Sequence, residues 1–255
     1  MGIAIRSPEG DYRDTAVRII PAVVPGLLLF SVYGGNVERS MRNLVGPSAA
    51  QLSNEGIDTA GSVTIATQYT GAKRAGVPIN EPVGGGTMIG VFAPSSLTAE
   101  VRHLSAWGKP RANAPGVATV GAAIGFGVVA GALAVRGWAG RTDAAGANAS
   151  LSATVAPTGG LAVDKLIAVA MRWGGADRTL TLNVLTTGQS AKAGLPGTTL
   201  WDPTKEGFYL GSDAGTPFTM AHGATQLYSR ILADAEVQAA YGQLKSYFAR
   251  RGVAI

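Results

Sequence analysis

The amino-acid sequence predicts an all-β fold that ends in one amphipathic helix, and two observations carry this prediction. The chain of 255 residues holds 36 Gly and 13 Pro but only 15% charged residues, which suits many short strands joined by tight turns. One segment near the C-terminus has helical spacing instead. Between residues 235 and 249, Val237, Tyr241, Leu244 and Phe248 recur at intervals of four, three and four, the spacing of one helical face.

In chain order, residues 1–20 are expected to form an N-terminal arm that packs on the domain or reaches a neighbouring chain. The arm is polar at first and turns apolar at Val17, Ile19 and Ile20. Residues 21–255 are expected to form one domain, because no internal repeat, heptad pattern or low-complexity linker divides them. All-β domains of this length are common.

Several stretches within this domain have the pattern of strands. Residues 62–69 alternate apolar and polar side chains with the period of two that a half-buried strand requires. Residues 161–185 predict a hairpin, with a turn at Gly174, Gly175, Ala176 and Asp177. Further strands are expected over 208–211, within 117–135 as two strands with a break near Gly125–Gly127, and before the helix, which stops at Gly252.

The residues that lead into the helix resemble the closing segment of concanavalin A-like, laminin G-like jelly rolls. Tyr228, Arg230 and Leu232 match the Tyr-x-Arg-x-Leu pattern of that family's last strand, and Asp234-Ala235-Glu236 opens the helix as its members do. Ala233 stands where the family has Ser or Thr, so a capping-box oxygen is missing and Asp234 is expected to cap the helix one residue later. The resemblance extends in order over residues 22–251 and implies further strands over 24–32 and 87–94. It implies a concanavalin A-like antiparallel β-sandwich with a short C-terminal helix.

Composition excludes several classes of function. The net charge of +5 comes from 21 basic and 16 acidic residues scattered without a run, so no nucleic-acid partner is expected. The chain has no Cys, which excludes a disulfide scaffold and thiolate metal sites. The amino terminus lacks the apolar core of a signal peptide. Residues 117–135 carry no charge, but their glycines favour buried strands over a membrane span, so no membrane insertion is expected.

No catalytic, metal or cofactor site is predicted, and the chain is not expected to be an enzyme. The two histidines, His103 and His222, lie in different segments without a further ligand nearby, which favours packing or surface roles. No Gly-x-Ser-x-Gly motif is present. Sandwich glycosidases need two carboxylates facing one sugar, and no predicted strand carries such a pair.

Glycan binding is harder to exclude, because aromatic rings stack on sugars. Trp107, Trp201 and Tyr209 lie near predicted loops and are the candidate glycan-binding residues, whereas Trp138 and Trp173 are expected to be core residues.

Two functions therefore stay open, with glycoside hydrolysis a third and weaker one. The resemblance implies a structural component of a bacteriophage virion, in the tail, a fibre or the head decoration, because domains of this family without catalytic carboxylates occur there. Such a protein would assemble in the bacterial cytoplasm as a homo-oligomer with other virion structural proteins, and its adhesion to a cell-surface glycan is compatible with that role. The alternative is a stand-alone, lectin-like glycan-binding module.

Overall fold

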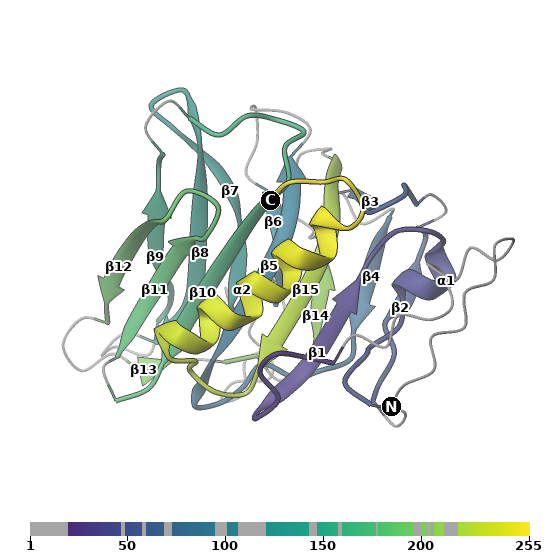
Figure 1. Ribbon diagram of the computed structural model, residues 1–255. Coiled ribbons are helices and arrows are strands. Elements are labelled where there is room, and N and C mark those ends of the chain that lie inside the picture. The colour runs from purple at the N-terminus through teal and green to yellow at the C-terminus, as the bar shows by residue number, and fades with distance from the viewer. Residues whose placement is uncertain are drawn as a thin grey trace, which may run out of the picture.

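The predicted all-β sandwich is confirmed. The computed structural model describes residues 20–46, 49–57, 60–68, 73–94, 101–106, 121–142, 147–157, 160–176, 178–195, 200–201, 203–204, 207–211 and 219–255. Two antiparallel sheets pack face to face, and the C-terminal helix lies on the outer face of one of them (Figure 1). The predicted arm, apart from Ile20, lies outside the described residues.

The sheet that carries the helix has seven strands, which pair in the order β1-β15-β5-β10-β11-β12, with β3 also paired to β15. These strands are β1 (Leu27–Val32), β3 (Ile65–Gln68), β5 (Gly85–Pro94), β10 (Ile167–Gly174), β11 (Thr179–Val184), β12 (Gln189–Gly194) and β15 (Thr219–Tyr228). The predicted hairpin over 161–185 is confirmed as β10 and β11. A short helix, α1 (Val37–Ser40), follows β1.

The second sheet has eight strands in the order β13-β8-β7-β6-β14-β4-β2, with β9 also paired to β8. They are β2 (Ser53–Glu55), β4 (Arg74–Val77), β6 (Val101–Ser105), β7 (Ala123–Val129), β8 (Ala132–Thr142), β9 (Asn148–Val155), β13 (Leu200–Trp201) and β14 (Phe208–Leu210). In the described part of the chain, no helix is long and apolar enough to cross a membrane.

The break expected near Gly125–Gly127 was wrong by several residues. Both glycines lie inside β7, and the chain turns at Ala130 and Gly131. A Cβ at Gly127 would lie 2.4 Å from Cδ of Arg136, so glycine there makes room for an arginine of the neighbouring strand. The residue type marks a close side-chain crossing at this position, not a turn.

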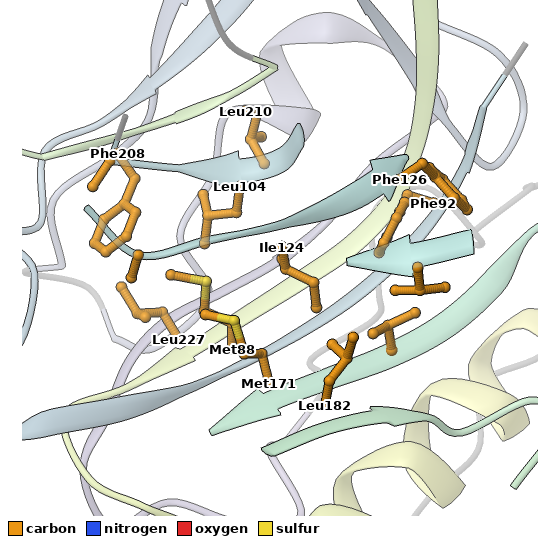
Figure 2. Close-up of a cluster of buried hydrophobic side chains, with 14 of the residues drawn as sticks. Met88, Phe92, Leu104, Ile124, Phe126, Met171, Leu182, Phe208, Leu210 and Leu227 are labelled. Atoms are coloured by element: carbon orange, nitrogen blue, oxygen red, sulfur yellow. The ribbon is translucent and has the colours of Figure 1, made fainter. Parts of the chain in front are cut away.

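The inner faces of the two sheets enclose the main core, as Figure 2 shows for fourteen of its side chains. Met88 and Phe92 from β5 meet Ile124 and Phe126 from β7, and the rings of Phe92 and Phe126 make an edge contact with centroids 4.9 Å apart. Trp173 is buried in this core, as expected. Trp138 is buried too, but on the outer face of the eight-stranded sheet, where the guanidinium groups of Arg102 and Arg136 lie over its ring.

A second core forms under α2 (Asp234–Ala249), which crosses the seven-stranded sheet diagonally (Figure 1). The predicted helical face is confirmed, because Val237, Leu244 and Phe248 are buried and Tyr241 is half-buried against the sheet. A Cβ at Gly223 of β15 would lie 2.7 Å from the Phe248 ring, so this glycine lets the helix sit close to the strand. Such apolar contacts hold a helix more firmly than its own propensity does.

The start of α2 is fixed by an ion pair and not by an N-cap side chain. Both terminal guanidinium nitrogens of Arg230 donate to the carboxylate of Glu236, at 2.9 and 2.5 Å, and these bonds together with the Ala233 N–H lower the pKa of Glu236 to about 2. The expected cap at Asp234 was wrong. Asp234 lies within the helix, and its carboxylate is instead 2.6 Å from Arg172 of β10.

Candidate functional site

The candidate site is a groove on the outer face of the seven-stranded sheet, beside the first turns of α2. The helix crosses β10, β5 and β15 but leaves β11 and β12 uncovered (Figure 1). Along β11 the side chains alternate, with Leu180, Leu182 and Val184 buried in the core. The residues between them, Thr181 and Asn183, therefore face outward into the uncovered area.

The groove has a volume of about 770 Å³ and is lined mostly by polar side chains. This volume falls within the range of small-molecule sites, roughly 300–1,000 Å³. Hydroxyl and amide groups come from both strands and the helix, and the polar lining residues are Arg172, Thr179, Thr181, Asn183, Ser190, Lys192, Asp234 and Gln238. Ile231, which is exposed, supplies apolar surface beside these polar groups.

Arg172 joins the floor of the groove to its helical wall. One terminal nitrogen lies 2.6 Å from the carboxylate of Asp234 and donates to the carbonyl of Leu232 at 3.1 Å. The other donates to Oδ1 of Asn183 at 3.2 Å. These contacts fix the amide of Asn183, so that its NH₂ group is the part left to face a ligand. The guanidinium is thus a positioning group that orders the strand and the helix around the cavity.

A glycine turn closes one end of the groove. Gly174 and Gly175 both have positive φ, of 98° and 71°, which glycine adopts without strain. A Cβ at Gly175 would lie 2.5 Å from Cδ1 of Ile231, and one at Gly174 would lie 2.5 Å from Cα of Gly85. The turn can therefore lie directly under the loop that leads into α2, which shapes this end of the cavity.

A very different polar cluster is buried between the two sheets. Nδ1 of His103, on β6, lies 2.9 Å from Nδ1 of His222, on β15. Beyond this pair, Nε2 of His222 contacts the hydroxyl of Thr67 at 2.6 Å, and Nε2 of His103 contacts that of Thr225 at 2.8 Å. The four side chains form one hydrogen-bonded chain that joins the sheets. One imidazole must donate and the other accept at the central contact, so neutral rings satisfy it and two charged rings do not.

Burial explains the electrostatics of this cluster. Both imidazoles are fully buried, and Phe92 stacks on His103 with ring centroids 4.3 Å apart. Desolvation lowers the pKa of His222 to about 3, and desolvation together with the neighbouring His222 lowers the pKa of His103 well below its ordinary value. The packing role expected for both histidines agrees with this geometry, and sequence spacing gave no sign that they touch.

The aromatic residues predicted to bind glycans do not gather in one place. Trp107 lies outside the described residues. Trp201, on β13, is half-buried against the main core, and its indole Nε1 is buried without a hydrogen-bond partner among the described residues. Tyr209 lies on β14, and the guanidinium of Arg74 covers one face of its ring at 3.8 Å. That guanidinium also pairs with Glu55 at 2.6 Å, so at most the opposite ring face is open to a ligand.

The groove residues were missed by sequence reasoning, which looked for aromatic side chains in loops. The available signal was the polar face of β11, where Thr179, Thr181 and Asn183 alternate with the core leucines.

Two further observations concern other kinds of site in the described residues. Among the described residues no group of three or more His, Cys, Asp or Glu is placed to hold a metal ion. A smaller hollow of about 500 Å³ beside α1 has polar groups that are mostly engaged in the fold, such as Asn43, which bonds the backbone of both Phe30 and Val45.

Comparison with known proteins shows the fold. No protein-family model and no curated protein sequence matches the chain. Among solved structures, the ligand-binding domain of botulinum neurotoxin serotype D in complex with N-acetylneuraminic acid has a TM-score of 0.59 at 12% identity, over 86% of this chain and 51% of that one. The binding domain of botulinum neurotoxin DC in complex with SialylT has a TM-score of 0.56 at 10% identity, over 86% of this chain and 52% of that one. Trypanosoma rangeli sialidase in complex with sialic acid has a TM-score of 0.55 at 15% identity, over 90% of this chain and 35% of that one. This chain thus spans about half of each toxin domain and about a third of the sialidase.

Proposed function

We propose that this chain is a non-enzymatic glycan-binding module whose ligand lies in the groove between β11, β12 and the first turns of α2. One observation carries the proposal: hydroxyl, amide and charged side chains from three elements converge on an open volume of about 770 Å³ that the helix leaves uncovered. Sugars present rows of hydroxyl groups, and such side chains can both donate to them and accept from them. Two of the structures that share the fold are complexes with sialic acid, which supports the same class of ligand.

Binding without hydrolysis fits the acidic groups that the groove offers. Asp234 is the one carboxylate among the described residues that line it. Glycoside hydrolysis ordinarily requires two carboxyl groups, about 5 to 10 Å apart. The carboxylate of Asp234 is moreover engaged by Arg172 at 2.6 Å.

The test is a glycan array followed by titration calorimetry on the full chain. The variant Thr181→Val/Ser190→Ala removes two hydroxyls from the groove floor and is expected to weaken binding of the best glycan by about tenfold. The matched control is Thr154→Val/Ser152→Ala on β9, where the same residue types lie on the other sheet. Equal loss in the control, or no loss in the groove variant, contradicts the proposed site, and the absence of any bound glycan contradicts the function.

A virion role stays a prediction that rests on the family resemblance alone, and the matched structures do not point to it. Its test is light scattering of the full chain and of a version without residues 1–20. An oligomer that becomes a folded monomer on truncation supports assembly through the arm, whereas a monomeric full chain contradicts self-assembly.

A further inference from the structure

Three residues cross the floor of the groove in one row, and the two at its ends are cationic. Arg172 is the register partner of Thr181, and Thr181 is the register partner of Lys192. Directly paired residues project from the same face of a sheet, so all three side chains point into the groove. With neighbouring strands about 4.8 Å apart, the Cα atoms of Arg172 and Lys192 are separated by about 10 Å, roughly the length of a disaccharide unit.

The two cations differ in what surrounds them. Arg172 is largely buried and has a carboxylate, a backbone carbonyl and an amide oxygen as partners. Lys192 is exposed, and its ammonium group has no ion pair or hydrogen bond within the described part of the chain. The charge of Arg172 is therefore compensated by the protein, whereas the charge of Lys192 is available to a ligand.

The helical wall adds positive potential on the opposite side. The groove meets the first turn of α2 at Asp234, Val237 and Gln238. The amino end of a helix carries a partial positive charge and favours anions. Asp234 is the one acidic group among the described lining residues, and Arg172 neutralises it. The net field over the polar floor is therefore positive.

Resting on the proposed function, we infer that the groove selects acidic glycans, in which a sugar carboxylate binds the ammonium group of Lys192. The hydroxyls of Thr181 and Ser190 and the amide of Asn183 then bond the hydroxyl groups of the same sugar or the next one. A carboxylate on a lysine is a charge-assisted contact, roughly twice as strong as a neutral hydrogen bond. Sialic acids and hexuronic acids both present this group.

Lys192 has a second explanation that the test must separate. β12 is an edge of its sheet and pairs with β11 alone among the described strands. Lysine on an edge strand discourages pairing with another sheet edge. If that were its whole role, replacing it would promote self-association and leave ligand preference unchanged.

The experiment is titration calorimetry of the full chain with matched ligands: methyl N-acetylneuraminide against its methyl ester, and a glucuronate disaccharide against the corresponding glucose disaccharide. The chain is expected to bind at least one acid about tenfold more tightly than its neutral partner. Lys192→Gln is expected to bind both members of that pair equally, at the affinity of the neutral one. Lys165→Gln, at an exposed lysine outside the groove, serves as the matched control and keeps the preference.

Three results overturn the inference while leaving the proposed function intact. The first is equal binding of acid and neutral partner by the unaltered chain, and the second is an acid preference that survives in Lys192→Gln. The third is a Lys192→Gln protein that loses the preference only because it self-associates, which light scattering alongside each titration detects. Failure of the unaltered chain to bind any of the four ligands or any glycan on an array overturns both the inference and the proposed function. The pair that shows the preference identifies the sugar acid as a sialic or a hexuronic acid.

Discussion

The seven-stranded sheet has a polar region on each of its faces, and the two are opposite in character. On the inner face His222 belongs to a closed chain in which His103, Thr67 and Thr225 supply partners for both ring nitrogens of each imidazole. On the outer face Thr181, Ser190 and Lys192 project into an open groove. Closed polar chains contribute to stability, because breaking one leaves buried groups unsatisfied. Polar side chains that face an open groove contribute little to stability, and their hydrogen-bonding groups are available to a ligand.

The two histidines serve the fold in this protein, and the proposed ligand-binding residues are of less reactive types. Histidine is the side chain most often suspected of catalysis or metal binding, yet here both histidines are fully buried and hydrogen-bonded to the protein. The residues proposed to bind the ligand are threonine, serine, asparagine and lysine, which are common on any surface. Position relative to α2 distinguishes them, and residue type does not.

The largest expected effect is a loss of stability when the hydrogen-bonded chain of His103, His222, Thr67 and Thr225 is broken. His222→Ala removes the partner of both His103 and Thr67 and leaves a cavity, so the free energy of unfolding should fall by about 3 kcal/mol. Urea denaturation measures this change. Glycan affinity of the folded fraction should be unaffected, since the groove lies on the other face. A loss of stability below about 0.5 kcal/mol contradicts the closed-chain account.

Lowering the pH is expected to reduce the stability of the fold through the same two buried histidines. Folding lowers the pKa of His222 to about 3 and that of His103 well below 6.5, so the unfolded chain binds protons that the folded chain rejects. The stability from both imidazoles is present above pH 6.5 and is lost as the pH falls below it, for His222 toward about pH 3. The slope is at most about 1.4 kcal/mol per pH unit for each imidazole.

Urea denaturation at several pH values between 7 and 4 measures this slope, and His222→Gln should reduce it by the share of one imidazole. A slope that is identical in His222→Gln and the unaltered chain would show that other groups govern acid sensitivity.

The groove variants should show the reverse pattern. Thr181→Val/Ser190→Ala is expected to change the free energy of unfolding by less than about 0.5 kcal/mol, because these side chains face solvent, while lowering glycan affinity by about tenfold. Calorimetry and denaturation on the same preparation separate the two quantities. A large loss of stability would mean that these hydroxyls belong to the fold and not to a site.

The smallest effect concerns the wall of the groove. Ala233 precedes α2 in an extended conformation and offers no side-chain oxygen to the helix, although its own N–H is held by Glu236 at 2.9 Å. Ala233→Ser completes the capping box and should raise the free energy of unfolding by about 0.5 to 1 kcal/mol. Thermal unfolding measures this gain. No gain would show that the ion pair between Arg230 and Glu236 already fixes the helix start.

The sequence allowed the fold to be predicted well because local patterns determine most of its elements. The helical spacing from Val237 to Phe248 and the alternation along β11 are both local signals. The residues of the closing motif are close in sequence, and Arg230 ties the loop after β15 both to Glu236 and to the carbonyl of Pro25. These features need no knowledge of distant contacts.

The sites escaped prediction because they depend on long-range register. His103 and His222 are separated by 119 residues and meet only when the two sheets face each other. The groove exists because α2 packs over β5 and β10 and leaves β11 and β12 bare, which no local pattern reveals. Tyr209 was chosen for its ring, and the cation of Arg74 over that ring came from another strand.

Nuclear magnetic resonance of the ¹⁵N-labelled chain, titrated with the best glycan found on an array, tests the central claim most directly. We expect shift changes in the backbone signals of Thr181, Asn183, Ser190 and Lys192 and in the first turn of α2, with Tyr209 and the indole of Trp201 unchanged. Changes that centre on Tyr209 or Trp201 instead, with the groove signals unmoved, would contradict it.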